Sequence, residues 1–448
     1  MRRRSFVLAG TASAVLTACG GGGGSSGSSG SGGVGTVPEA QNRFTQANLV
    51  ASNSSYGAKY VLPDFLDAWG IAIRPAGAGG HFWIGGGGAS WEFIGDVRNS
   101  PTASLRELTT DGLQRVSVTG TQNPVAGGTV TGVAFNGAAI TSTIFEPVFT
   151  DTRTMPPTVL RQTMPDGAGG TVTIQGSARF IFVTDNGYIA AWSERRQDNG
   201  QILRNDGGTQ RVFDGTVMGS AFFGAAVKPD TFDTLWVADF GASPQIRQFD
   251  AAWNLVPTVG FVNPFGTGAG GAVKPGDFVP FNIQTLGHRV LVTYAKSRLG
   301  PSDITTFYAG KEDAVDADAE RLGGYQPDRG RLVEFTTAGQ QVRIYQDAKH
   351  LNAPWGVALA PDSFGAFAGA VLVGNFGGAG LISGFSSSTG EFLGYLRTPS
   401  GAFVAITGLW GLQFGNGASL GDSDALYFAA GPEDEKAGLF GSLRYSPG

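Results

Sequence analysis

The chain lacks residues on which several classes of protein depend. Its 448 residues include one cysteine, Cys19, and three histidines. A disulfide framework is therefore excluded, and transition-metal sites built on histidine or cysteine are disfavoured. Charged residues make up 15% of the chain, and the formal net charge is −5. This acidic balance argues against a nucleic-acid partner, because nucleic acids reward basic surfaces.

Long apolar runs and the motifs of common enzymes are also missing. No run of 18 or more apolar residues follows the N-terminal segment, so the sequence predicts no membrane-spanning helix. No Gly-x-Ser-x-Gly elbow precedes a helix, which disfavours a serine hydrolase. The glycine run 85–88 follows a predicted strand without the Gly-Lys-Ser/Thr and helix of a phosphate loop.

What the chain does contain is a repeat of two short apolar runs, found six times. The chain contains 72 glycines, far above the usual share of about 7% of residues. Glycines in this number supply the tight turns between such runs. The first runs span 69–73, 131–135, 223–227, 281–285, 355–359 and 410–414, and the second span 82–86, 181–185, 235–239, 290–294, 372–375 and 426–430. Short strands recurring at roughly 40–50 residues are typical of radially stacked four-stranded blades. The sequence therefore predicts an all-β, six-bladed β-propeller.

The last repeat offers only three strands, over 407–414, 425–429 and 439–445. One plausible strand, 48–51, precedes the first blade. We expect this N-terminal strand to complete the sixth blade and close the ring, because closure removes exposed sheet edges. Two long insertions, 140–177 and 297–330, interrupt blades two and four. Long loops on a rigid scaffold often carry function, although the acidic run in the second is more typical of a solvated surface.

The first residues have the features of an export signal. Residues 1–18 combine a basic start, an apolar stretch and small residues at the end. Arg3-Arg4 with the residues after it resembles a twin-arginine export signal, and 16–19 resembles a bacterial lipobox ending in Cys19. Residues 19–40 then form a Gly/Ser-rich tether, and 41–448 the propeller. The alternative is a chance cysteine in an ordinary signal peptide.

The chain also resembles a family of uncharacterised secreted bacterial propellers related to NHL-repeat proteins. The matching stretches are 48–50, 68–72, 278–284, 351–356, 372–377, 409–412, 430–432 and 438–441. Together they cover nearly all of the chain after the tether. Many members carry a C-terminal Pro-Glu-Pro sorting tail, which this chain lacks. The resemblance implies the fold and secretion, and no settled activity.

A candidate binding site follows from propeller geometry. The loops entering the innermost strands and those leaving the second strands share one face around the central channel. The loops entering the innermost strands carry Asp64, Asp67, Trp69, His350, Asn352, Trp355 and Trp410; those leaving the second strands carry Asp185, Asn186, Asp239, Tyr294, Asn375, Glu433, Asp434 and Glu435. From these and the inner strands we predict ligand-binding roles for Asp185, Asp239, Asn282, Asn352, Trp355, Asn375 and Glu435. For each of them, ordinary turn chemistry or packing between blades is the competing interpretation.

Two functions compete at this point. The favoured one is a non-enzymatic ligand-binding or scaffolding module, monomeric and lipid-anchored at the cell envelope. The outer membrane is the expected location, with either face open, and an envelope protein or glycan is the expected partner. The alternative is a calcium-dependent lactonase or lyase, with Asp185, Asp239 and Glu435 as candidate metal ligands.

The enzyme hypothesis makes a structural demand. It requires Asp185, Asp239, Asn282, Asn375 and Glu435 to converge on one point. The inner strands themselves supply only Asn282, Gln284 and Gln413 as polar residues. His350 is the one plausible general base, although a single loop histidine is more often incidental.

Overall fold

A computed structural model describes residues 37–118, 128–166, 168–196, 202–203, 208–297, 327–347 and 349–447. The ring belongs to one compact unit, Val34–Gly448. Cys19, the predicted export signal and the predicted tether up to residue 36 lie outside the described residues, as does most of the 297–330 insertion.

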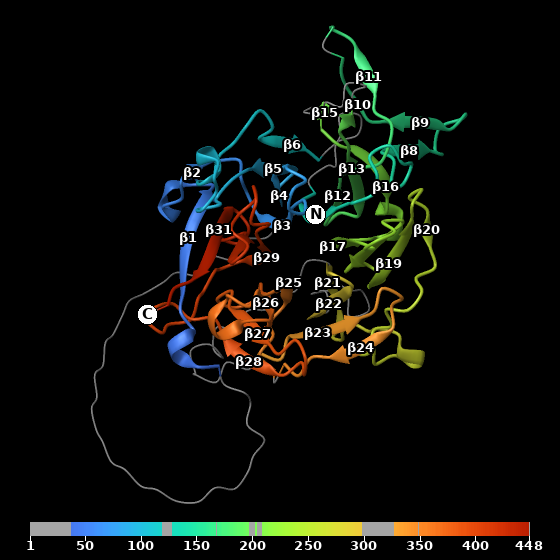
Figure 1. Cartoon of the computed structure of the whole chain (residues 1–448). Helices are drawn as coiled ribbons and strands as arrows, with labels where there is room; N and C mark the ends of the chain where they lie inside the picture. Colours follow the sequence, from blue (N-terminus) through green and yellow to red (C-terminus); the bar gives the residue numbers. More distant parts are fainter. Residues whose placement is uncertain are drawn as a thin grey trace, which may run out of the picture. The chain divides into compact units, whose positions relative to one another are not determined.

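Six sheets radiate around one channel, as the sequence predicts (Figure 1). From the innermost strand outward, blade one consists of β3 (Ala68–Ala72), β4 (Phe82–Gly86), β5 (Ala89–Phe93) and β6 (Arg115–Ser117). Blade two consists of β7 (Val130–Phe135), β12 (Phe180–Thr184), β13 (Tyr188–Trp192) and β16 (Gln210–Asp214). Blade three consists of β17 (Phe222–Val227), β18 (Thr234–Asp239), β19 (Gln245–Asp250) and β20 (Leu255–Val256). Blade four consists of β21 (Phe278–Leu286), β22 (Arg289–Lys296), β23 (Gly330–Phe335) and β24 (Gln341–Ile344). Blade five consists of β25 (Pro354–Leu359), β26 (Val371–Asn375), β27 (Ile382–Phe385) and β28 (Phe392–Tyr395).

The sixth blade joins the two ends of the described chain and confirms the predicted closure. It consists of β29 (Leu409–Phe414), β30 (Ala425–Ala430) and β31 (Leu439–Tyr445), followed by the N-terminal β1 (Phe44–Ala51). Strand β1 pairs antiparallel with β31, from Phe44 opposite Tyr445 to Ala51 opposite Leu439. The short β2 (Tyr60–Val61) adds a parallel fifth strand. The edge of β31 is therefore covered by the first strand of the ring.

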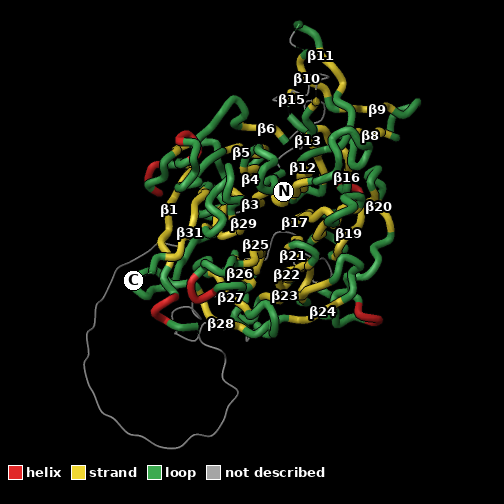
Figure 2. Tube along the Cα trace, viewed as in Figure 1, coloured by secondary structure: helices red, strands yellow, loops and turns green. Residues whose placement is uncertain are grey.

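Strands and loops make up almost all of the described chain (Figure 2). Its helices are single 3₁₀ turns: η1 (Glu39–Gln41), η2 (Ser54–Tyr56), η3 (Ala103–Leu105), η4 (Thr216–Met218), η5 (Ala269–Gly271) and η6 (Gly365–Phe367). Within these residues no helix has the length and apolar character needed to cross a membrane.

The 140–177 insertion forms two small hairpins. They are β8 (Val148–Asp151) with β9 (Thr158–Arg161), and β10 (Thr163–Pro165) with β11 (Thr171–Thr173). Strand β8 contacts β16, the outer strand of blade two. The guanidinium of Arg211 lies over the ring of Phe149, 4.6 Å from its centroid. A further short pair, β14 (Arg195–Arg196) and β15 (Ile202–Leu203), follows β13.

Glycines explain how six inner strands fit around a narrow channel. Each inner strand contacts the next, and β29 contacts β3 to complete the circle. A Cβ added at Gly356 would lie 2.4 Å from the carbonyl oxygen of Trp410, and one at Gly411 2.3 Å from that of Trp69. Neighbouring backbones are therefore in direct contact, which only glycine permits. The recurring apolar-Gly pair of the repeat is a packing signature.

Candidate functional site

Aromatic side chains close one end of the channel. We call the face where the inner strands begin the front face, and the face where they end the rear face. Five of the six inner strands carry an aromatic residue near their start: Trp69, Phe223, Phe281, Trp355 and Trp410. All five are buried in one cluster. We call them the aromatic plug.

Ring contacts hold the aromatic plug together. The rings of Trp69 and Trp410 stack with centroids 3.4 Å apart, and Trp355 meets both edge-on at 6.0 and 6.2 Å. The indole N–H of Trp355 donates to the carbonyl oxygen of Phe223 at 2.9 Å. In the remaining inner strand, β7, the equivalent residue is Thr131. Its hydroxyl donates to the carbonyl oxygen of Phe222 at 2.7 Å and lies 3.1 Å from that of Val183. The plug therefore fills the front end of the channel with packed, hydrogen-bonded side chains.

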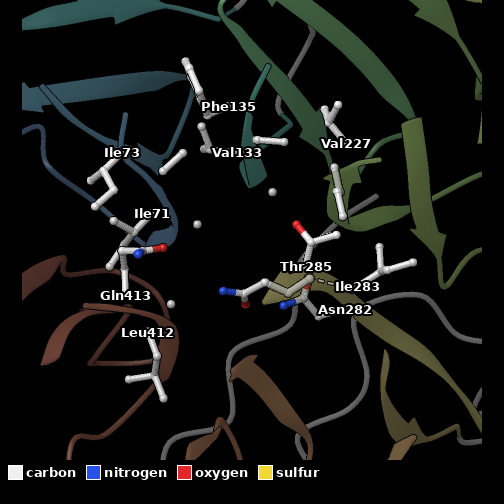
Figure 3. Close-up of a pocket in the computed structure, with 18 of the residues that line it drawn as sticks. Ile71, Ile73, Val133, Phe135, Val227, Asn282, Ile283, Thr285, Leu412 and Gln413 are labelled. Atoms are coloured by element: carbon white, nitrogen blue, oxygen red, sulfur yellow. Dashed lines mark hydrogen bonds between the residues drawn. The ribbon is translucent and has the colours of Figure 1, made fainter. Parts of the chain in front are cut away.

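Behind the plug lies a cavity of about 260 Å³. Residues from all six inner strands line this cavity. Trp355 of the plug lies at its front end, and residues 73, 135, 227, 285 and 413, near the ends of their strands, lie toward its rear. Apolar side chains of blades one to three form one wall, including Ile71, Ile73, Val133, Phe135 and Val227 (Figure 3). The opposite wall, from blades four and six, carries Asn282, Gln284, Thr285 and Gln413. No lining side chain carries a charge.

The rear mouth of the cavity is edged by Phe232 and Pro229, in the loop after β17. Phe232 adopts a φ of 55°, a left-handed conformation that costs a bulky residue roughly 1–2 kcal/mol. Its ring covers Gly137 of blade two, where an added Cβ would lie 2.6 Å from the ring. Strained backbone conformations of this kind cluster at functional sites, ligand sites among them.

The amides on the polar wall differ in how many hydrogen bonds they already make. Asn282 uses both ends: its Nδ2 donates to the carbonyl oxygen of Trp355 at 2.8 Å, and its Oδ1 accepts from the amide of Ile283 at 2.8 Å. Asn282 is therefore held at both ends of its side-chain amide by the backbone. Gln284 and Gln413 each use one end of the side-chain amide.

Carboxylates gather on the front face, beyond the plug. Asp67 is buried, and its Oδ1 accepts the indole N–H of Trp69 at 2.6 Å. Burial and the neighbouring Glu435 raise the pKa of Asp67 well above its usual range, and Asp185 adds a smaller effect in the same direction. Asp185 in turn accepts the backbone amide of Thr129 at 2.7 Å. Within the described residues no group of three His, Cys, Asp or Glu side chains could hold a metal ion.

Two other predicted site residues serve their own turns. Asp239 is fully buried and accepts from the Ser220 hydroxyl and from the amides of Ala221 and Gly241, each at 2.9 Å. It also forms an ion pair with Arg247. Asn375 accepts the amide of Asn352 at 2.8 Å and donates to the carbonyl oxygen of Leu381 and the hydroxyl of Ser383. These contacts fix the loops after β18 and β26.

The remaining candidates lie away from the cavity. His350 stacks on Phe392 of β28 with centroids 4.2 Å apart, and its carbonyl oxygen accepts the Tyr395 hydroxyl. That position is at the outer strand of blade five. Asn352 is buried against Gly377 in the loop before β25.

Of the seven predicted ligand-binding residues, Asn282 and Trp355 line the cavity and the other five do not. Gln284, Thr285 and Gln413 were not among the predicted site residues. The only sequence signal for Gln284 and Gln413 is an amide on a predicted inner strand.

Comparisons with known proteins add little about function. No family model matches the chain. Two curated relatives from Acanthamoeba polyphaga mimivirus, the uncharacterized proteins L690 and R648, are each 30% identical over 211 residues, 47% of this chain. The match covers 49% and 46% of their own lengths, so the chain spans about half the length of the curated relatives it matches.

Similar solved structures include the Pan2 WD40 domain of Neurospora crassa, at 12% identity and a TM-score of 0.37, with 91% of this chain and 97% of that one covered. Another is a protein of unknown function from Bacteroides caccae, at 11% identity and a TM-score of 0.31, with 81% and 82% covered. Likenesses this remote carry no functional argument. The propeller rests on the strand pairing of the chain itself.

Proposed function

We propose that this protein is a ligand-binding propeller at the cell envelope, with its site in the rear half of the central channel. The cavity behind the aromatic plug carries the proposal. It is concave, apolar along blades one to three and furnished with a few oriented polar groups, as small-molecule sites are. Its volume of about 260 Å³ is small for such a site. An engineered cavity of about 150 Å³ holds benzene, so this one suits a bicyclic molecule.

The chemistry of the lining favours binding over catalysis. General acid–base and nucleophilic catalysis need titratable or nucleophilic groups beside the substrate. The lining offers amides, one threonine hydroxyl and apolar side chains. The calcium-dependent alternative requires five oxygen ligands that converge. Asp239 and Asn375 instead accept the backbone amides of Ala221 and Asn352, just ahead of β17 and β25. Asn282 is bonded to the backbone of β21 and β25.

The proposed location rests on the N-terminal sequence. Residues 1–18 have the composition of an export signal, Cys19 ends a lipobox-like run, and a Gly/Ser-rich tether follows. The resemblance to secreted bacterial propellers points the same way. We place the lipid anchor at Cys19 and the ring, after the Gly/Ser-rich segment, at the outer membrane.

Naphthalene is a suitable probe, because it is apolar, fluorescent and small enough for the cavity. The full chain carrying Cys19→Ala avoids detergent, which would compete for naphthalene. We expect saturable binding that Ala225→Phe abolishes, since Ala225 lines the channel. Ala418→Phe is the matched control, because Ala418 lies exposed in a loop. Equal binding by both variants, or no saturable binding by the parent chain, would overturn the proposal.

A further inference from the structure

The polar wall of the cavity holds two glutamines whose orientations are fixed by the backbone. Oε1 of Gln284 accepts the backbone amide of Val357 at 3.2 Å. Nε2 of Gln413 donates to the carbonyl oxygen of Phe414 at 2.9 Å. A backbone N–H requires an acceptor and a backbone carbonyl requires a donor, so neither side-chain amide can be flipped without losing its bond.

Each glutamine consequently has one end of its side-chain amide available to a ligand. Gln284 retains its NH₂, a donor, and Gln413 retains its carbonyl oxygen, an acceptor. In the described part of the chain, neither group has a hydrogen bond to protein. Figure 3 shows the Gln413 amide, from blade six, and the Thr285 hydroxyl, from blade four, both turned toward the channel. The cavity thus presents one donor, one acceptor and a hydroxyl that can be either.

We infer that the channel ligand is a neutral molecule with a planar apolar body and a carboxamide or lactam edge. This inference rests on the proposed function. The carbonyl of such an edge accepts from Gln284, and its N–H donates to Gln413. The apolar body then packs on the opposite wall, against Ile71, Val133 and Phe135.

The uncharged lining excludes charged ligands of the same size. No lining side chain could compensate a carboxylate or an ammonium for the water it loses. A ligand without polar groups also fits less well, because the available amide ends of Gln284 and Gln413 would lose water without gaining a partner. Recognition by both glutamines therefore separates amides from acids and from hydrocarbons.

Three probes of nearly equal size test this: 1-naphthamide, naphthalene and 1-naphthoate. Their affinities are measured by fluorescence titration on the full chain carrying Cys19→Ala. We expect 1-naphthoate to bind at least about tenfold more weakly than 1-naphthamide. We also expect Gln284→Met and Gln413→Met each to lower the affinity ratio of naphthamide to naphthalene by about five- to tenfold.

Further variants separate recognition from folding. Gln284→Glu keeps an acceptor for Val357 and replaces the donor with a carboxylate oxygen, so it too should lower that ratio. Gln341→Met, at an exposed position on β24, is the matched control and should leave the ratio unchanged.

An unchanged ratio in all three channel variants, with naphthalene still bound, would overturn the amide inference alone. Loss of saturable naphthalene binding by the parent chain would instead count against the proposed function.

Discussion

The contact between inner strands makes Gly356→Ala a severe substitution. The new Cβ would lie 2.4 Å from the carbonyl oxygen of Trp410 and 2.8 Å from the amide nitrogen of Leu412. Both atoms are backbone, so no rotamer change relieves the clash, and β25 must move away from β29. Overpacking of this kind costs about 1–3 kcal/mol, and we expect the upper end of that range here.

Differential scanning calorimetry measures the effect. An unfolding entropy of roughly 2.1 cal/mol/K per residue, over roughly 400 residues, converts about 3 kcal/mol into a Tm lower by about 3–4 °C. Gly411→Ala should behave alike, because its Cβ would lie 2.3 Å from the carbonyl oxygen of Trp69. Gly112→Ala is the control, since an added Cβ there meets nothing within 4 Å. If Gly356→Ala and the Gly112→Ala control have the same Tm, contact between the inner strands does not limit the residue at position 356.

Three further predictions concern stability and location. Glu92 is fully buried, and burial raises its pKa well above the usual range. The protonated Glu92 therefore stabilises the fold fully below the pKa of the unfolded state, and this stabilisation is lost as pH rises through the raised pKa of the folded state. The Tm of Glu92→Gln minus that of the parent should consequently increase as pH rises from 4 to 8. A Tm difference that stays constant over this range would contradict the prediction. Asp239→Ala leaves the buried Arg247 unpaired and should cost about 3–5 kcal/mol in urea unfolding, whereas a loss under 1 kcal/mol would show the pair to be dispensable. Cys19→Ala should move the protein from membrane to soluble fractions, and continued membrane association would rule out a lipid as the sole anchor.

The fold could be predicted from the sequence because it depends on local patterns. Short apolar runs such as 235–239 can only be buried by stacking one blade on the next. The need for a partner strand beside β31 follows from counting strands in the last repeat, and β1 supplies it. The Trp-Gly pairs at 69–70, 355–356 and 410–411 pack between neighbouring inner strands, as their position suggests.

The cavity could not be predicted in the same way. Whether the front or the rear of the channel is open depends on how Trp69, Trp355 and Trp410, from three different blades, stack on one another. The sequence gives no sign of that stacking. Polar residues at strand ends favour a site on the front face. There Asp239 instead holds the segment before β17, and Asn375 holds the loop after β26.

The glutamines show a second limit of sequence reasoning. Gln284 and Gln413 are recognisable as amides on predicted inner strands. Which of their atoms remains available depends on the backbone of Val357 and Phe414, on strands β25 and β29. That information exists only once the strands are in register.

The most direct test of the central claim is a crystal of the chain soaked with 4-bromo-1-naphthamide, with the bromine located by anomalous scattering. The account predicts one bromine site inside the channel, behind Trp355, with the amide edge on Gln284 and Gln413. A bromine site on the front face beside Asp67 and Glu435, or none in the channel at saturating probe, would contradict it.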